Sequence, residues 1–161
     1  MYFADIIKND PASDRSLSLD DWIRVYTDLE GKITYYFRQN LGGGKFGAST
    51  TFNPGMSCPQ GSGYAFGDFN GDSLDDLLCL KAGTQVSVSL NRGGSPPKFE
   101  SIGVVVPSSL GWNIQDLWIA DIDGDGRADI VCLELAGKLT SWLNKNDGMK
   151  DVGQIKLTEG W

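Results

Sequence analysis

Residues 121–129 read DIDGDGRAD, and residues 68–76 read DFNGDSLDD. Each stretch leads directly into a short apolar run, IVCL at 130–133 and LLCL at 77–80. The two copies stand 53 residues apart at both their first and their last aspartate, so a whole unit is repeated and not only a loop. A fixed period of this length predicts a modular fold, in which each unit covers its apolar face with a neighbouring unit.

A third and less complete copy opens the chain. Residues 3–6 (FADI) match residues 119–122 (IADI), and Asp5 and Asp21 stand where the later loops have their first and last aspartates. The loop between them is longer by eight residues, and it carries Ile7 where the later loops carry an oxygen-bearing side chain. The first unit is therefore expected to share the fold of the other two, although its loop is degraded.

Each unit also contains further short runs of strand-like sequence. A second run follows a glycine, as at 83–91 and 137–144, and a turn then leads to another run, clearest at 99–106 and 152–157. No segment shows a helical periodicity of useful length. Four short strands joined by hairpins are the blade of a β-propeller. A β-sandwich would also accept such strands, but it gives no reason for a strict repeat.

The predicted architecture is all-β, with a single repeat domain over residues 1–161. It contains three four-stranded antiparallel blades, at about 1–55, 56–110 and 111–161. A closed propeller typically has four to eight blades, so this one is partial. Two alternatives follow: a homodimer completes a six-bladed ring, or the chain is a fragment of a longer propeller.

The acidic loops have the spacing of a calcium site. Ca²⁺ takes six to eight oxygen ligands at 2.3–2.6 Å, and side chains at loop positions 1, 3, 5 and 9 with a carbonyl at position 7 can surround it. The predicted ligands are Asp68, Asn70, Asp72, Asp76 and the Leu74 carbonyl in the second unit, and Asp121, Asp123, Asp125, Asp129 and the Arg127 carbonyl in the third. We expect two bound Ca²⁺, while only Asp5 and Asp21 remain for a degraded third site.

Two other interpretations of these loops fit the sequence less well. An EF-hand is excluded, because it needs Glu at position 12 and flanking helices, whereas Cys79 and Cys132 stand there between strands. A metal-free acidic turn would hold several mutually repelling carboxylates together without a cation, which is costly.

The bulk composition excludes several classes of protein. The net charge is −7 with only 14 Lys and Arg, so a nucleic-acid partner is not expected. No apolar run has membrane-spanning length, and residues 1–5 lack the features of a signal peptide, so an export signal would lie outside this sequence. The chain has no His, which excludes a Ser–His or Cys–His nucleophile, and its paired carboxylates are accounted for by metal. We expect no enzymatic activity.

The three cysteines cannot form a complete disulfide framework. Cys79 and Cys132 occupy the same position in two units, inside apolar strands, and are predicted to be small buried thiols. Cys58 lies in a loop rich in proline and glycine, where exposure is possible.

Taken with the strands that follow them, the loops resemble the FG-GAP/VCBS repeats of integrin α-subunit propellers and of many secreted microbial proteins. Residues 66–72 and 119–129 carry this resemblance. Residues 152–156 and the Gly-Trp pairs at 111–112 and 160–161 are most similar to fungal secreted versions, often appended to SGNH-type esterases or other hydrolases. The resemblance covers essentially the whole chain. It implies calcium on the two ligand sets, a propeller fold and an extracellular role.

The function expected from the sequence is a non-catalytic binding module with a glycan or protein ligand at the blade loops. Trp112 and Trp161, at unit junctions, are the candidates for sugar stacking, whereas Trp22, Trp118 and Trp142 are expected to pack between blades. The alternatives are an accessory domain of a secreted hydrolase and an integrin-like adhesion surface.

Overall fold

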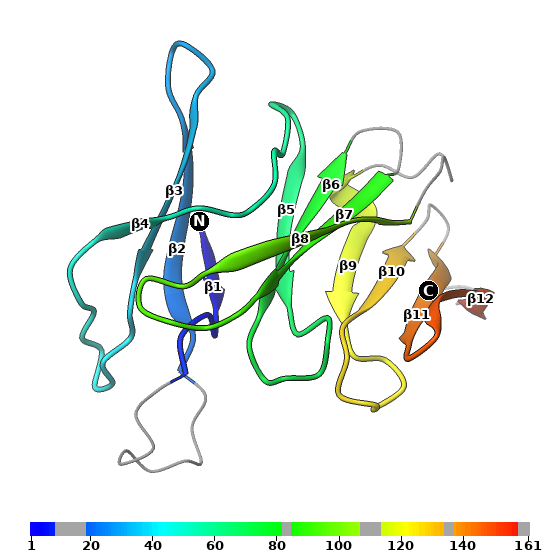
Figure 1. Ribbon diagram of the computed structural model, residues 1–161. Coiled ribbons are helices and arrows are strands. Elements are labelled where there is room, and N and C mark those ends of the chain that lie inside the picture. Colours follow the sequence, from blue (N-terminus) through cyan, green and yellow to red (C-terminus); the bar gives the residue numbers. More distant parts are fainter. Residues whose placement is uncertain (9–18, 82–84, 107–113, 134–136, 158–161) are drawn as a thin grey trace.

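The computed structural model describes residues 1–8, 19–81, 85–106, 114–133 and 137–157. Three four-stranded antiparallel sheets follow one another along the chain (Figure 1). The strands are β1 (Tyr2–Ala4), β2 (Asp21–Thr27), β3 (Ile33–Arg38), β4 (Thr50–Phe52), β5 (Gly63–Gly67), β6 (Asp76–Lys81), β7 (Gln85–Asn91), β8 (Phe99–Val106), β9 (Leu117–Ala120), β10 (Asp129–Leu133), β11 (Lys138–Lys145) and β12 (Gly148–Leu157), with a 3₁₀ turn, η1 (Ile114–Asp116), before β9. The all-β class and the three antiparallel four-stranded sheets are confirmed.

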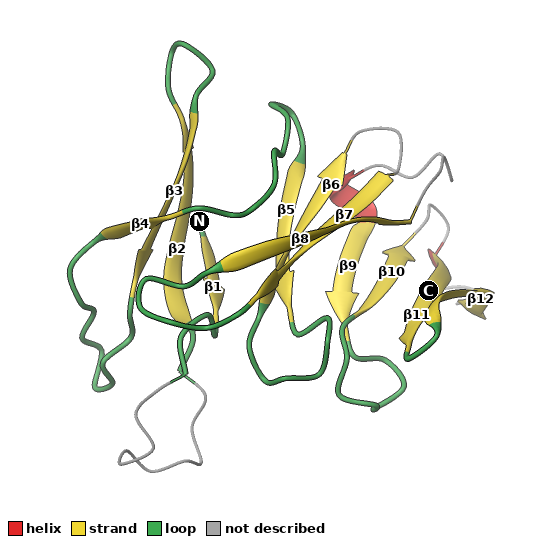
Figure 2. Ribbon diagram, viewed as in Figure 1, coloured by secondary structure: helices red, strands yellow, loops and turns green. Residues whose placement is uncertain are grey.

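The sheets have the arrangement of adjacent propeller blades. In each sheet the strands are ordered as they occur in the chain, and β1 lies beside β5 while β5 lies beside β9. The first strands therefore adjoin one another, as they do around a propeller axis. The three sheets do not close into a ring. The β5–β6 and β9–β10 loops, which carry the acidic sequences, lie at the same end of the molecule (Figure 2).

Two apolar cores hold the sheets together. The first lies between the first and second sheets and includes Ile23, Phe37 and Leu77. The second lies between the second and third sheets and includes Leu78 and Ile130. Neighbouring residues of β6 thus point into different cores, because side chains alternate along a strand. Both faces of the second sheet are covered, so successive residues of β6 are all apolar, which explains the continuous LLCL run at 77–80.

Close approach of the inner strands depends on a small residue. A Cβ atom at Gly67, the last residue of β5, would lie 2.9 Å from Ile119 Cγ2 and 3.0 Å from Ala128 Cβ. Only glycine lets β9 pack this closely against the end of β5.

The structure corrects the interpretation of two cysteines. Cys58 and Cys79 form a disulfide with their Cα atoms 5.8 Å apart, and Cys58 is buried. The connection from β4 to β5 packs through Met56 into the first core, which brings Cys58 to the face of β6 that carries Cys79. The predictions of a thiol at Cys79 and of a possibly exposed Cys58 are wrong. Cys132 is a buried thiol, as expected.

The disulfide gives a first testable prediction. The Cys58→Ser variant should lose about 2–4 kcal/mol of unfolding free energy, because the bond closes a loop over 21 residues of sequence separation in the unfolded chain. Urea titration of both proteins measures the loss. A reductant should destabilise the wild type by a similar amount and leave the variant unchanged; equal stability of the oxidised and reduced wild type contradicts the prediction.

Among the described residues, no helix has the length and apolar character that a membrane crossing requires.

Candidate metal centre

Both acidic loops curl around their first aspartate. In the β9–β10 loop, Asp121 Oδ1 accepts hydrogen bonds from the backbone N–H groups of Gly124 and Asp125, at 2.7 and 3.2 Å, and Oδ2 accepts one from Gly126 at 2.9 Å. In the β5–β6 loop, Asp68 accepts the corresponding three bonds, from Gly71, Asp72 and Ser73. This nest of donors fixes the loop backbone before any ion is considered.

One substitution between the loops has a structural cost. Gly126 has a φ of +84°, and Ser73, at the corresponding position, has a φ of +67°. A side chain in this left-handed region is strained relative to glycine. The second loop thus keeps the same shape with a less suitable residue.

The last aspartate of each loop is fully buried and accepts two backbone hydrogen bonds. Asp129 Oδ2 accepts from Ile122 N at 3.0 Å, and its Oδ1 accepts from Asn144 N at 2.8 Å, at the far end of β11. Asp76 makes the same two bonds to Phe69 N and Asn91 N. This carboxylate therefore ties the loop to the third strand of its own sheet. Sequence reasoning assigned it only to the metal.

The degraded first loop keeps the same pair of hydrogen bonds to its last aspartate. Asp21 is fully buried, its Oδ2 accepts from Ile7 N at 3.1 Å, and its Oδ1 accepts from Asn40 N at 2.8 Å. Asp5 instead faces the second sheet, where its N–H donates to Asp75 Oδ2 at 2.8 Å. The first loop thus retains the structural part of the pattern, and Asp5 and Asp21 take part in different contacts.

The third loop brings carboxylates to the separation that a calcium ion requires. One oxygen each of Asp121, Asp123 and Asp129 lies within 4.8 Å of the others. Oxygens on one Ca²⁺ can be no further apart than about 5 Å, because each lies 2.3–2.6 Å from the ion. Three of the predicted ligands therefore fit a common cation.

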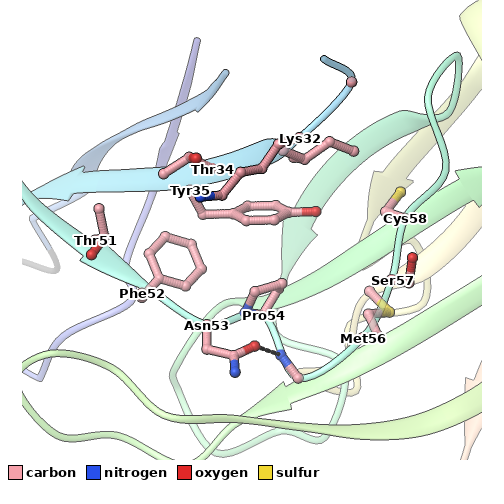
Figure 3. Close-up of a pocket in the computed structure, with 13 residues that line it drawn as sticks. Lys32, Thr34, Tyr35, Thr51, Phe52, Asn53, Pro54, Met56, Ser57 and Cys58 are labelled. Carbon is pink, nitrogen blue, oxygen red and sulfur yellow. Dashed lines mark hydrogen bonds between the residues drawn. The ribbon is translucent and has the colours of Figure 1, made fainter. Parts of the chain in front are cut away.

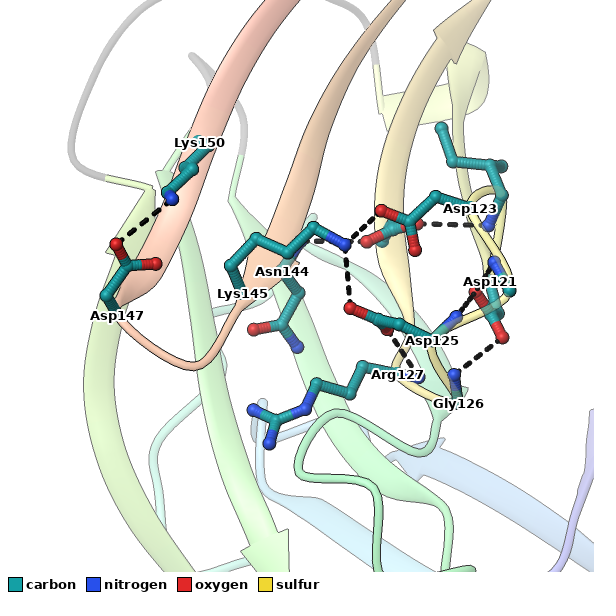
Figure 4. A network of polar contacts seen from close by, with 12 residues as sticks. Asp121, Asp123, Asp125, Gly126, Arg127, Asn144, Lys145, Asp147 and Lys150 are labelled. Carbon is teal, nitrogen blue, oxygen red and sulfur yellow. Dashed lines mark hydrogen bonds and ion pairs between the residues drawn. The ribbon is translucent and has the colours of Figure 1, made fainter.

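The fourth predicted side chain of this loop is engaged by a lysine. Lys145, the last residue of β11, lies with its ammonium group against Asp123 Oδ2 and at 2.7 Å from Asp125 Oδ2 (Figure 4). The hydrogen bond from Lys145 holds the pKa of Asp125 below its usual value, and the two carboxylates raise the pKa of Lys145. A single positive charge thus offsets part of the loop's negative charge.

In the second loop the corresponding basic residue points elsewhere. Arg92 takes the position of Lys145, and its Nε lies 2.8 Å from Glu100 Oε2. Burial raises the pKa of Asp76 to about 7, and the carboxylates of Asp72 and Asp68 add to this shift. A carboxylate that is hard to ionise beside other carboxylates marks a place where a divalent cation would lower the energy.

The remaining ligands of the second loop are held by short local bonds. Asn70 Oδ1 accepts from Asp72 N at 2.9 Å, and Asn70 Nδ2 donates to Asp72 Oδ2 at 3.1 Å. Leu74 N donates to Asp72 Oδ1 at 2.9 Å, just as Arg127 N donates to Asp125 Oδ1 at 3.1 Å. The two loops therefore share one backbone conformation around positions 5 and 7.

Competition between Lys145 and calcium gives a second prediction. The Lys145→Gln variant should bind Ca²⁺ roughly tenfold more tightly at the third loop, since the ion no longer has to displace an ammonium group. Titration calorimetry measures the affinity. The matched control is Lys150→Gln, which removes a pair with Asp147 (3.0 Å) and should leave calcium binding unchanged. Unaltered or weaker binding by Lys145→Gln contradicts the assignment.

The tryptophan predictions have mixed outcomes. Trp142 is buried in the second core, and Trp22 is half-buried beneath the guanidinium of Arg38 at 5.6 Å. Trp118 is 61% exposed, so the prediction that it packs between blades is wrong within one chain. Among the described residues, no further sheet lies against its face of the third sheet. Trp112 and Trp161 lie outside the described residues.

Two buried asparagines complete the site, and sequence reasoning missed them. Asn91 is the last residue of β7, and Asn144 is the last but one of β11. Each side chain donates a hydrogen bond to the preceding sheet. Asn144 follows Asn91 by 53 residues, the same interval that separates the acidic loops, and this spacing was the signal that could have identified them.

Comparison with known proteins identifies a repeat that spans the second and third loops. Residues 68–132, which contain both, match the model of the FG-GAP-like repeat family. This segment is similar to FG-GAP-like repeats. Repeats of that type build β-propeller modules, are typical of extracellular proteins and are generally non-catalytic. The chain matches no curated protein and no solved structure.

Proposed function

We propose that this protein is a non-catalytic β-propeller module, stabilised by calcium, that binds a glycan or protein ligand outside the cell. The observation that carries the calcium part is the convergence of Asp121, Asp123 and Asp129 oxygens within 4.8 Å, in a hairpin loop of an FG-GAP-like repeat. The ion would join the two strands of the hairpin, with Asp68, Asp72 and Asp76 holding a second ion in the other loop. Its contribution is structural.

An extracellular setting agrees with two features. A disulfide joins Cys58 to Cys79, and such bonds persist mainly in oxidising compartments. Repeats of this family are typical of extracellular proteins. Calcium there is abundant enough for sites of modest affinity to be filled.

A groove offers a place for the ligand. It has a volume of about 790 Å³ and lies between residues 31–35 and residues 51–58 (Figure 3). The rings of Tyr35 and Phe52 lie 5.6 Å apart in its wall, and polar side chains such as Asn53 surround them. Both rings are buried, so a ligand in the groove would meet mainly its hydrogen-bonding groups, which suit the hydroxyl groups of a sugar.

A glycan array probed with the folded protein in calcium tests the binding part. We expect a restricted set of glycans to bind. Silence across the array, with an unchanged fold, favours the alternative function: an accessory or scaffold domain of a secreted hydrolase such as an SGNH-type esterase.

The outer faces of the first and third sheets, which no other sheet of the described part of the chain covers, bear on how the module is completed. We propose that a second copy covers them in a six-bladed homodimer, in place of further blades of a longer chain.

A further inference from the structure

The contact between the first and second sheets has a polar part that is built from backbone and one asparagine. Asn91 Nδ2 donates to Ile6 O at 2.9 Å, and Asp75 N donates to Asp5 O at 2.7 Å. The donors belong to the second sheet and the acceptors to the loop after β1. The chain thus joins each sheet to the previous one by a fixed pair of bonds, here called the seam.

The contact between the second and third sheets repeats this seam. Asn144 Nδ2 donates to Phe69 O, and Ala128 N donates to Asp68 O at 2.7 Å. Donors again lie in the later sheet and acceptors in the earlier one. Two independent copies of one geometry show that the seam is a property of the repeat.

The first sheet carries the donor half of a seam. Asn40 N donates to Asp21 Oδ1 at 2.8 Å, and Asn40 Nδ2 donates to Asp20 O at 3.1 Å, bonds that Asn91 also makes with Asp76 and Asp75. Among the described residues, Asn40 Nδ2 has no acceptor in another sheet, whereas Asn91 and Asn144 each have one.

The third sheet carries the acceptor half. Ile122 follows the first loop aspartate as Phe69 does, and its N–H makes the same bond to the buried loop aspartate, at 3.0 Å. The hairpin that presents the Phe69 carbonyl to Asn144 is therefore reproduced at Ile122, without a described sheet beyond it.

The apolar contacts between neighbouring sheets also have an exposed counterpart on each outer sheet. Phe66 of β5 packs on Tyr2 of β1, with ring centroids 5.6 Å apart. Phe3 stands two residues before its loop aspartate, as Phe66 does, and pairs with Trp22 as Phe66 pairs with Leu77. Phe3 is 53% exposed.

The residue equivalent to Tyr2 is Trp118, three positions before the loop aspartate in β9, and it is exposed. Ala120, beside it, corresponds to Gly67, on which Ile119 packs inside the chain. Exposed Phe3 and exposed Trp118 thus occupy complementary positions on opposite outer sheets.

We propose that two copies of this chain associate head to tail, with Phe3 of one copy against Trp118 and Ala120 of the other and with Asn40 Nδ2 donating to the Ile122 carbonyl. Two such seams close a ring with twofold symmetry. Because each outer face holds only one half of the seam, a like-with-like contact would oppose donor to donor, and a second copy of the chain supplies the missing half at both ends.

The face around Phe3 contains charge that this contact has to accommodate. Arg24 lies over the Tyr26 ring at 5.3 Å, and Arg38 lies over the Trp22 ring at 5.6 Å. Planar guanidinium groups stacked on rings are common in protein interfaces, where one side remains hydrogen-bonded at the rim. These arginines are compatible with a buried contact.

Light scattering in calcium tests the proposal. The wild type should have twice the mass of one 17.5 kDa chain, and Phe3→Asp and Trp118→Asp should each have the mass of one. The control Leu29→Asp places the same charge on an exposed leucine of the β2–β3 turn and should stay paired. A single-chain wild type, or pairing that survives both face variants, overturns the proposal.

Mixing the two face variants tests the head-to-tail geometry. The Phe3→Asp chain keeps its Trp118 face and the Trp118→Asp chain keeps its Phe3 face, so a mixture should recover a two-chain mass that neither variant has alone. A mixture that stays single-chain overturns the head-to-tail pairing. The inference rests on the propeller arrangement of the proposed function but not on its calcium. A single-chain protein whose melting temperature still responds to calcium would contradict the two-chain ring and leave the calcium proposal intact.

Discussion

Removing calcium should lower the melting temperature of this protein by roughly 10–20 °C. An ion at a hundredfold excess over its Kd stabilises the folded state by about 2.7 kcal/mol per site, so two filled loops contribute about 5 kcal/mol. A loss of 1 kcal/mol lowers the melting temperature by about 2–4 °C in a domain of this size. Calorimetry with and without a chelator measures the shift.

A matched pair of variants assigns this effect to the loops. Asp123→Ala removes one of the three carboxylates that lie together and should halve the calcium response, because one of two sites is lost. Asp147→Ala removes an exposed carboxylate that pairs with Lys150 and should leave the response intact. Equal responses in the two variants would mean that the acidic loops do not hold the ion.

The Asp21→Ala variant should lose about 4 kcal/mol of unfolding free energy, whether or not calcium is present. Asp21 is fully buried, and its two oxygens accept the N–H groups of Ile7 and Asn40. Removal of the carboxylate leaves the buried N–H of Ile7 and the half-buried N–H of Asn40 unpaired, at about 1–3 kcal/mol each. Denaturant unfolding in calcium and in chelator measures the loss.

Asp28→Ala is the control for this loss, because the Asp28 carboxylate also accepts two backbone N–H groups, from Glu30 and Lys32. These lie in an exposed turn where water can replace the carboxylate, so the variant should lose less than about 1 kcal/mol. If the loss in Asp21→Ala depended strongly on calcium, Asp21 would be a metal ligand and not a residue that only holds the loop by hydrogen bonds.

Sequence periodicity was sufficient to predict the strands and their grouping. The alternation of polar and apolar residues in runs such as 85–91 reflects the extended local backbone. The 53-residue interval reflects the contact between neighbouring units. Both patterns depend on residues that lie within one unit or in the next one. The positions of the acidic loops between first and second strands followed for the same reason.

The contacts that escaped prediction depend on tertiary placement. Cys58 meets Cys79 only because the β4–β5 connection packs into the first core, and nothing in the spacing of cysteines encodes that path. Asp76 carries the oxygen-ligand signal of its loop, but its bonds to Phe69 N and Asn91 N require the end of β7 to lie beneath the loop. Trp118 has the local sequence of a core residue, and its exposure reflects the absence of a described sheet beyond β9.

The two-sided burial of the second sheet has a consequence for biosynthesis. Leu77 and Leu78 point into different cores, so the middle unit acquires its second cover only after the third unit has left the ribosome. Until then one apolar face of the second sheet stays exposed on the nascent chain, and the next unit to emerge covers it.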